Sequence, residues 1–218
     1  MKKLIIIGGF GNGTVAQSTV NDINERSKEW ELLGFLNDRE DGPINGSPVL
    51  GKIDKETAAK YLEDENVYFL YTLISVKLNF NFIHKLTDLE IPNERFATLI
   101  HPTAVVSKNA KIGFGVSIQP FVSVGPNVSI GNHVQIYAQS LIGHGSTLED
   151  YSYVANNACI GADVVLKEGA YLGTNATTLE FVSLGKWSVS GIGSVIIRDV
   201  DDYGKVVGNP AKSIGSVR

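Results

Sequence analysis

The second half of the chain repeats with a period of six residues. Counting every sixth residue from Val106 to Ile196, fourteen of sixteen positions are aliphatic, and the exceptions are Thr178 and Ser190. The position two residues earlier in each unit is always Ala, Ser or Val. An α-helix repeats at about 3.6 residues and an isolated strand at about two. A six-residue period therefore indicates one short strand followed by one tight corner.

Three such units close one triangular turn of a parallel β-helix, and stacked turns bury the aliphatic column. Sixteen units predict roughly five turns. The column of Ala, Ser and Val residues must be small because it packs close to the corners. Glycine often follows the aliphatic residue, and we expect it to supply corner conformations that other residues resist. These glycines are Gly113, Gly125, Gly131, Gly143, Gly161, Gly173, Gly185 and Gly191.

Residues 1–100 follow a different pattern, in which short apolar runs alternate with stretches of helical periodicity. This β-α-β alternation predicts a small Rossmann-like, doubly wound parallel sheet. Asp54 is expected to cap the second helix and Pro92 to end the third. We therefore expect an α/β domain over residues 1–100 and an all-β domain over residues 101–218. The predicted strands cover 3–8, 30–38, 67–75 and 95–100, and the predicted helices cover 14–26, 55–65 and 79–91.

Composition excludes several classes of protein. The net charge is −4 and there is no basic stripe, which argues against a nucleic-acid binder. No window approaches the ~18 apolar residues of a membrane span. The one cysteine, Cys159, cannot form an intramolecular disulfide. We expect it to be a small packed residue in a reducing compartment. The sequence thus predicts a soluble, cytoplasmic protein.

The repeat resembles that of the hexapeptide acyltransferases, whose coil is left-handed, and we take the hand of the coil from this resemblance. The tail "GKVVGNPAKSI", residues 204–214, resembles the end of their coil. A glycine-rich loop after the first strand, "GFLND" after the second and "LIHPTAVVS" at the junction narrow the match. They are similar to the sugar O- and N-acetyltransferases of the sialic acid O-acetyltransferase (NeuD)/PglD type. The resemblance covers essentially the whole chain.

This resemblance implies transfer of an acetyl group from acetyl-CoA to the amino group of a nucleotide-linked amino sugar in glycan biosynthesis. It also implies a homotrimer whose active sites lie between subunits. Transfer to an amine requires a base, and histidine, which titrates near neutral pH, suits that task. His144 follows Ile142–Gly143 at a corner of the coil. The resemblance assigns the role of general base to His144.

The sequence departs from the resembled pattern in two places. An acidic residue often follows the catalytic histidine, and here that residue is Gly145. A second histidine often lies nine residues on, and here that residue is Tyr153, whose hydroxyl can donate the same hydrogen bond to the acetyl carbonyl. The group that orients His144 must then come from elsewhere. The candidates are a backbone carbonyl, Asp150, Asn156 and Asn157.

The other three histidines have simpler interpretations. His101 precedes the coil and is expected to be a structural cap. His133 is expected to be an exposed corner residue, and His84 a surface or satisfied core histidine on the third helix.

The loop "IIIGGFGNGTVA" lacks the strict G-x-G-x-x-G spacing of a dinucleotide site. A glycine-rich turn between strand and helix can still present backbone N–H groups to a phosphate. The resemblance assigns this loop to the nucleotide sugar. Residues that end the second and third strands should border the same crevice. The predicted nucleotide-sugar residues are Gly9, Gly11, Asn12, Gly13, Asp38, Arg39, Ile74 and Ser75.

The resemblance places acetyl-CoA in a groove between two coils, which requires more than one subunit. Lysines there would suit the phosphates of CoA. No metal is expected. The predicted acetyl-CoA residues are Gly143, Gly161, Gly173, Thr174, Lys186, Pro210 and Lys212.

Three alternatives remain open at this point. A sialic acid or related sugar O-acetyltransferase would use nearly the same mechanism on a hydroxyl. A catalytically silent nucleotide-sugar-binding scaffold would explain Gly145 and Tyr153. A zinc carbonic anhydrase on the same coil would need three converging histidines, and His133 and His144 lie 11 residues apart with no third histidine on the coil.

Overall fold

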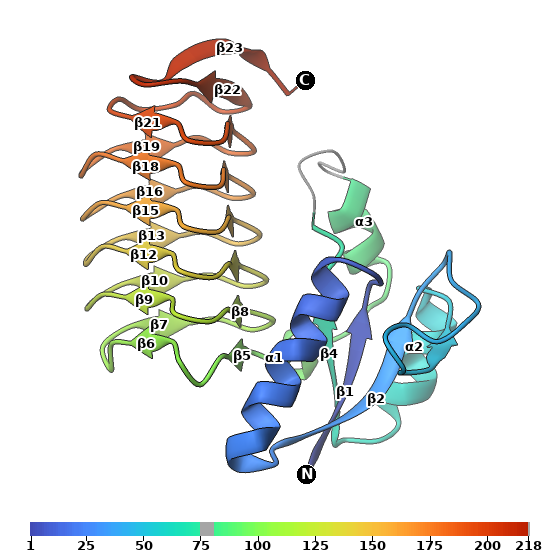
Figure 1. Cartoon of the computed structure of the whole chain (residues 1–218). Coiled ribbons are helices and arrows are strands. Elements are labelled where there is room, and N and C mark those ends of the chain that lie inside the picture. Colours follow the sequence, from blue (N-terminus) through green and yellow to red (C-terminus); the bar gives the residue numbers. More distant parts are fainter. Residues whose placement is uncertain (75–80, 218) are drawn as a thin grey trace. The chain divides into compact units, whose positions relative to one another are not determined.

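The computed structural model describes residues 1–74 and 81–217, so the predicted site residue Ser75 lies outside the described residues. The chain divides into two compact units after Pro102, and each unit is described by itself. Figure 1 shows helices around a short sheet in the first unit and a stack of turns in the second. Among the described residues, no helix is long and apolar enough to cross a membrane.

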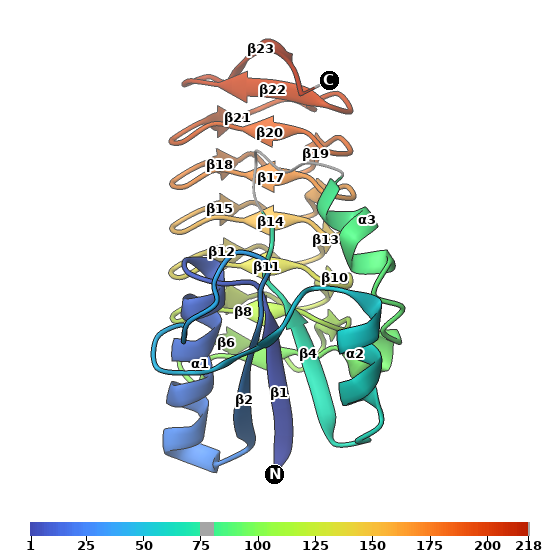
Figure 2. The ribbon, with the colours of Figure 1, turned by 90° about the vertical axis from the view of Figure 1, so that its right-hand side faces the viewer.

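The N-terminal unit is built on a four-stranded, wholly parallel sheet with strand order β3-β2-β1-β4. Helices α1 and α2 lie on opposite faces of this sheet (Figures 1 and 2). The elements are β1 (Lys2–Ile7), α1 (Asn12–Ser27), β2 (Trp30–Leu36), β3 (Val49–Gly51), α2 (Lys55–Leu62), β4 (Val67–Tyr71), α3 (Asn81–Thr87), the 3-10 turn η1 (Asn93–Arg95) and β5 (Leu99–Ile100).

The apolar run of β1 explains why the strand is central. Its last four residues, Leu4 to Ile7, are fully buried, as expected for a parallel strand covered on both faces. Ala16, Val20 and Ile23 give α1 the apolar stripe that packs against this core. Asp54 caps α2, since its carboxylate accepts a hydrogen bond from the amide of Thr57 at 2.8 Å, and that prediction is confirmed.

The fourth strand of the sheet differs from the prediction. The sequence indicated residues 95–100, but the edge strand is β3. Among the described residues, a single bridge between Phe69 and Phe96 joins the predicted segment to the sheet. Its apolar residues Ala97 and Leu99 instead pack into the core of the unit. β3 escaped prediction because three residues are too few to show an alternating pattern.

The C-terminal unit is a parallel β-helix of sixteen two-residue strands on three faces. Each strand pairs in parallel with the third strand after it, so that Ser129 lies over Thr147, 18 residues on. The first face holds β6 (Val105–Val106), β9 (Ser123–Val124), β12 (Leu141–Ile142), β15 (Cys159–Ile160), β18 (Thr177–Thr178) and β21 (Val195–Ile196). The second holds β7 (Lys111–Ile112), β10 (Ser129–Ile130), β13 (Thr147–Leu148), β16 (Val165–Leu166) and β19 (Ser183–Leu184). The third holds β8 (Ser117–Ile118), β11 (Gln135–Ile136), β14 (Tyr153–Val154), β17 (Tyr171–Leu172) and β20 (Val189–Ser190).

The C-terminal tail closes the coil with β22 (Gly204–Val207), parallel to β20, and β23 (Lys212–Ser216), antiparallel to β22 (Figure 2). We call the corner from the first face to the second the first corner, that from the second to the third the second corner, and that from the third to the first the third corner.

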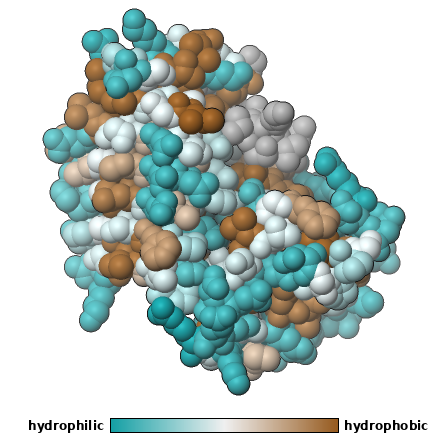
Figure 3. All heavy atoms as spheres, in the orientation of Figure 1, coloured by the Kyte–Doolittle hydropathy of each residue, from teal (hydrophilic) through white to brown (hydrophobic). Residues whose placement is uncertain are grey.

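The aliphatic and small columns fill the interior of the coil, as the six-residue period predicts. Ile136, Leu148 and Leu172 are fully buried, as are the small residues Ser146 and Ser152. The other residue of each strand faces outward. Cys159 is such a residue in β15 and is exposed, so its prediction as a packed residue was wrong. Figure 3 shows apolar groups scattered among hydrophilic ones on one side of the coil.

The glycines that follow the aliphatic residue do not supply the corner conformation, contrary to the prediction. None of them has a positive φ. A Cβ on Gly125 would lie 2.9 Å from the amide nitrogen of His144, and one on Gly173 would lie 2.6 Å from the carbonyl oxygen of Ser190. These glycines therefore let successive turns approach closely.

The left-handed backbone comes two residues later, in every unit from residue 115 to residue 193. Four glycines adopt this left-handed conformation, but most residues that adopt it in the coil are not glycine. The non-glycine residues with this conformation in the coil are Phe121, Asn127, His133, Gln139, Tyr151, Asn157, Asp163, Asn175, Phe181 and Trp187.

Substitution of Gly185 can test whether this set of glycines is required for the close approach of successive turns. A Cβ at Gly185 would overlap the amide nitrogen of Asp202, so Gly185→Ala should lower the free energy of unfolding by about 1–3 kcal/mol. Gly193 has φ 65 and nothing within 4 Å of a built Cβ, and Asn175 holds the same position one turn earlier. Gly193→Asn should therefore change stability by less than about 0.5 kcal/mol. Thermal unfolding midpoints compare the two, and equal midpoints would contradict the assignment.

Candidate functional site

His144 stands exposed at the first corner, between β12 and β13. Its backbone is held from both neighbouring turns. On one side Gly125 allows the close approach described above. On the other, the carbonyl oxygen of His144 accepts a hydrogen bond from the amide of Asp163 at 2.9 Å. The main chain is thus fixed while the imidazole projects from the coil.

The positions around His144 carry little side chain. Residues 18 apart stack on each other, so the neighbours of His144 are Pro126 on one turn and Ala162 on the other. Gly143 precedes His144, and Gly161 precedes Ala162. The corner therefore leaves the imidazole exposed.

The absent acid after His144 has a structural cause. Gly145 is the left-handed residue of this corner, with φ 69. A Cβ on Gly145 would overlap the Oδ1 atom of Asp163, one turn on. A side chain at residue 145 is therefore excluded unless Asp163 moves.

Within one chain the structure does not bring Tyr153 to His144. Tyr153 lies on the third face, where it stacks between Tyr137 at 4.8 Å and Tyr171 at 4.7 Å. Burial, and then the neighbouring Tyr137, raise the pKa of Tyr153, so its hydroxyl stays a proton donor. Within a single coil it has no access to the first corner.

The predicted orienting residues also lie at other corners. Asp150 is at the second corner, where its carboxylate accepts a hydrogen bond from the amide of Asn132 at 2.7 Å. Asn156 and Asn157 are at the third corner, between β14 and β15. Each six-residue unit advances one face, so only residues about 18 positions away share a corner with His144. None of these three side chains can orient His144 within one chain.

The predicted acetyl-CoA residues are divided between the corners. Gly143 and Gly161 share the first corner with His144, whereas Gly173 and Thr174 are at the third corner. Lys186 is at the second corner, where its ammonium lies 3.3 Å from a carboxylate oxygen of Glu168. That hydrogen bond raises the pKa of Lys186. One chain therefore assembles only the first two beside the histidine.

Pro210 and Lys212 belong to the tail, and Lys212 borders a pocket of about 320 Å³. Arg198 lines the same pocket and occupies the position of His144 three turns later in the first corner. Two carboxylate residues, Asp199 and Asp201, also line this pocket. Arg198 and Lys212 are both exposed. Arg198 was not predicted from the sequence. Its position could have been identified, because residues 18 apart stack on each other and Arg198 lies 54 residues after His144.

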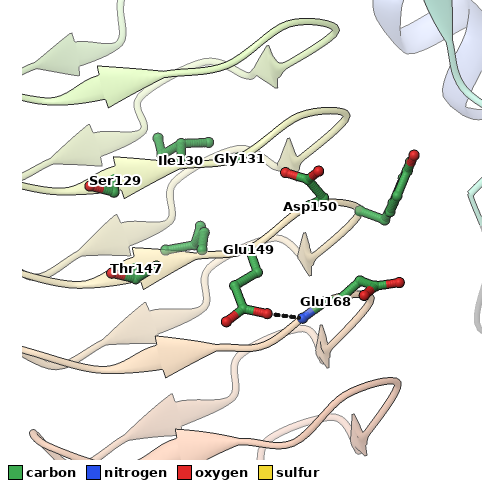
Figure 4. Close-up of a pocket in the computed structure, with 9 residues that line it drawn as sticks. Ser129, Ile130, Gly131, Thr147, Glu149, Asp150 and Glu168 are labelled. Carbon is green, nitrogen blue, oxygen red and sulfur yellow. Dashed lines mark hydrogen bonds between the residues drawn. The ribbon is translucent and has the colours of Figure 1, made fainter.

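A pocket of about 550 Å³ lies on the second face and second corner, and it does not include His144. Figure 4 shows the carboxylates of Glu149, Asp150 and Glu168 at its edge. Glu149 accepts a hydrogen bond from the amide of Glu168 at 2.9 Å. Three carboxylates make this pocket unfavourable for a phosphorylated ligand.

The N-terminal unit has its own pocket, of about 400 Å³, at the carboxyl ends of its strands. Three predicted nucleotide-sugar residues, Gly9, Asp38 and Arg39, line it. The other residues that line the pocket were not among the predicted site residues, because they come from α3 and from several strand ends that are distant in the sequence. These are Phe10, Asn37, Glu40, Ile53, Tyr71, Leu73, Phe82 and Lys85.

Asp38 is the charged centre of this pocket. Burial alone would raise the pKa of its carboxyl, but hydrogen bonds from Lys85 and from the amide of Ile53 outweigh it and hold the pKa below the ordinary value. Tyr71 also lines the pocket, and its hydroxyl donates a hydrogen bond to the carbonyl of Phe82 at 2.8 Å. Burial, and then the charge of Asp38, raise the pKa of Tyr71.

The glycine-rich loop is fixed by packing as well as by glycine geometry. Gly11 precedes α1 with φ 87, and Gly13 packs against the ring of Phe35, 3.3 Å from a built Cβ. The side-chain amide of Asn12 donates to the backbone carbonyl of Ile74 at 3.0 Å and so ties the loop to the segment after β4. Asn12 thus has a structural role, and the buried Ile74 takes part through its backbone.

The other histidines are structural or remote. His101 is buried, with Nε2 3.0 Å from a carboxylate oxygen of Asp22. His133 was expected to be exposed but is buried, because its ring stacks on Tyr151 at 5.4 Å. Burial lowers the pKa of His133 to about 4, so it is neutral at pH 7. His84 is exposed on α3. The described part of the chain holds no group of three potential metal ligands.

Comparison with known proteins gives two family matches. Residues 3–71 match the model of the PglD N-terminal domain, and residues 109–144 match the bacterial transferase hexapeptide model of six repeats. No curated protein matches the chain. The family resemblance stated from the sequence is confirmed. So is the fold class, a Rossmann-like α/β unit followed by a left-handed parallel β-helix.

Several solved structures are similar over nearly the whole chain. The acetyltransferase domain of PglB from Neisseria gonorrhoeae FA1090, in complex with acetyl coenzyme A, is 25% identical, with a TM-score of 0.83 and coverage of 98% of this chain and 99% of that one. A histidine-to-asparagine variant of perosamine N-acetyltransferase from Caulobacter crescentus, in complex with CoA and GDP-perosamine, is 22% identical, with a TM-score of 0.86 and coverage of 99% and 98%. WeeI from Acinetobacter baumannii AYE is 22% identical, with a TM-score of 0.80 and coverage of 98% and 100%.

The Asp38–Lys85 pair can be tested by titration. Lys85→Met should raise the pKa of Asp38, because the depressed value reflects hydrogen bonding and charge from Lys85. The ion pair stabilises the fold above the ordinary pKa of Asp38, and this stabilisation is lost as pH falls through its folded-state pKa. The ¹³C shift of the Asp38 carboxyl against pH measures the change. Lys52→Met is the matched control and should produce a smaller rise, since Lys52 is the weakest contributor. Equal titration curves for wild type and Lys85→Met would refute the pairing.

Proposed function

We propose that this chain is an acetyltransferase that moves an acetyl group from acetyl-CoA to the amino group of a nucleotide-linked amino sugar, with His144 as general base. The single observation that carries the assignment is the position of His144. It projects from a corner whose neighbouring positions are glycine, proline and alanine, on a coil otherwise built for packing. The similar structures described with acetyl coenzyme A, or with CoA and GDP-perosamine, support this substrate pair.

The chemistry follows from these groups. The acceptor amine attacks the carbonyl carbon of the thioester directly in a ternary complex, forming the N–C bond. The amine proton passes to the free ring nitrogen of His144. The C–S bond then breaks, and the proton is delivered to the departing sulfur of CoA. No covalent acyl-enzyme is required, since positioning the amine and removing its proton suffice.

For the nucleotide half of the acceptor we propose the pocket of the N-terminal unit. Backbone N–H groups at the start of α1, after Gly9 and Gly11, suit a phosphate. Arg39 and Lys85 supply positive charge, and the exposed Phe10 offers a ring on which a base can stack. Asn12, Gly13, Ile74 and Ser75 stay predictions for this site.

For acetyl-CoA we propose the first corner, running from His144 past Gly161 towards Arg198 and Lys212. These two cations suit the phosphates of CoA. Pro210 precedes Lys212 in the same tail and stays a prediction for this site. Gly173, Thr174 and Lys186, together with Tyr153, can join the site only from another copy of the chain. Their predicted roles therefore depend on the proposed homotrimer, in which each site uses two subunits.

His144→Gln should reduce kcat by about 10²- to 10⁴-fold, because the variant lacks a base for the amine proton. Release of free thiol from acetyl-CoA, measured with UDP-, dTDP- and GDP-linked amino sugars, reports the reaction. His84→Gln is the matched control, since His84 is exposed in the other unit and should keep full activity.

Three results would overturn parts of this proposal. Full activity of His144→Gln would remove His144 as base. Release with free sialic acid alone would point to an O-acetyltransferase. No release with any acceptor, in a protein that still binds nucleotide sugar, would favour a binding scaffold.

Arg198→Ala should raise KM for acetyl-CoA by about tenfold and leave kcat within about twofold, because its charge binds a phosphate remote from the thioester. Arg26→Ala, which removes an arginine from the N-terminal unit, is the control for loss of one positive charge. An unchanged KM for acetyl-CoA in Arg198→Ala would exclude Arg198 from the binding groove.

A further inference from the structure

Asp163 is a carboxylate residue at the same corner of the coil as His144. It belongs to the first corner, one turn after His144, and its amide donates to the carbonyl of His144 at 2.9 Å. Successive parallel strands lie about 4.8 Å apart, so the two side chains leave the coil from adjacent levels of one corner. Both residues are exposed.

The carboxylate of Asp163 also occupies a particular space. It lies where a side chain on Gly145 would begin, since a Cβ at that residue would overlap its Oδ1 atom and lie 3.0 Å from its Cγ atom. Position 145 is where the resembled pattern places an acid after the histidine. In this chain the negative charge reaches that space from the next turn instead.

Four other carboxylates of the coil cap backbone amides of a neighbouring turn. Within the described residues the carboxylate of Asp163 accepts no hydrogen bond, and the imidazole of His144 makes none either. The capping carboxylates are Glu149 to the amide of Glu168 at 2.9 Å, Asp150 to Asn132 at 2.7 Å, Asp199 to Ser183 at 2.8 Å and Asp202 to Lys186 at 2.8 Å.

We propose that Asp163 is the positioning residue for His144. Its carboxylate accepts a hydrogen bond from one imidazole nitrogen and thereby fixes the tautomer and the ring orientation. The other ring nitrogen is then unprotonated and faces the acceptor amine. The amine proton goes to His144 and is not passed on to Asp163. This inference rests on the proposed role of His144 as base.

Gly145 and Asp163 form a coupled pair under this proposal. The left-handed backbone at residue 145 admits glycine freely and aspartate at some cost, but the carboxylate of Asp163 already fills the space. Asp163 is itself left-handed, with φ 53, so glycine can replace it without strain. The acid can therefore be moved from residue 163 to residue 145 by two substitutions.

The first test removes the charge and keeps the shape. Asp163→Asn should lower kcat by about 10- to 1000-fold, with KM for acetyl-CoA and for the sugar changed less than about twofold, because binding groups are untouched. Glu65→Gln is the matched control. Glu65 is exposed in the N-terminal unit and lines none of the proposed sites, so its loss should leave kcat within about twofold.

The second test reads the tautomer of the resting enzyme and does not depend on activity. The ¹⁵N shifts of the His144 imidazole should show one dominant tautomer in the wild type and a mixture in Asp163→Asn. Glu65→Gln should give the wild-type spectrum. Identical spectra for wild type and Asp163→Asn would show that no such hydrogen bond exists.

The third test is a transplant. Asp163→Gly alone should lose activity as Asp163→Asn does, and the double variant Gly145→Asp, Asp163→Gly should recover at least about tenfold in kcat. Thermal midpoints of all variants exclude a folding defect as the cause. A double variant that folds but recovers nothing would count against a positioning carboxylate at this corner.

The outcomes separate this inference from the proposed function. If His144→Gln is inactive while Asp163→Asn keeps full kcat and an unchanged imidazole spectrum, the base assignment stands and the positioning role falls. If the wild type acetylates no acceptor, the proposed function falls, and the ¹⁵N spectra still decide whether Asp163 binds the His144 ring.

Discussion

The ladder of backbone hydrogen bonds between successive turns is the interaction on which the coil depends. The amide of Thr147 donates to the carbonyl of Val164 at 2.9 Å, and the amide of Ser129 donates to that of Ser146 at 2.9 Å. The same offset recurs along every face, so residues 18 apart are held one above the other. The side chains on the outer surface of the coil are therefore arranged in columns of residues 18 apart.

The interior of the coil could be predicted because the six-residue period is a property of the sequence itself. Leu148 and Leu166 are adjacent in space because the period requires it. The role of glycine could not be predicted in the same way. A glycine can signal either a left-handed backbone or a close approach, and only the structure shows that Gly125 serves the second purpose and Gly145 the first.

The candidate site was harder to predict, because the residues beside His144 are its neighbours in a column of the coil and not in the sequence. Tyr153 is nine residues from His144, which is one and a half units and leads to another face. Asp163 is nineteen residues away and lies beside it. The pocket of the N-terminal unit has the same difficulty. Asp38 was predicted from the end of β2, but its partner Lys85 comes from α3, 47 residues later.

Under the proposed function, the column that contains His144 also lets one corner bind a long co-substrate. Acetyl-CoA is an extended molecule whose thioester is far from its phosphates. The position of His144 is occupied by Ala162 one turn on, by Glu180 two turns on and by Arg198 three turns on. The proposed site therefore has a small residue beside the base and a cation three turns away for the phosphates. The rigid spacing of the ladder would then set the distance between the base and the phosphate-binding charge, with no dedicated loop required.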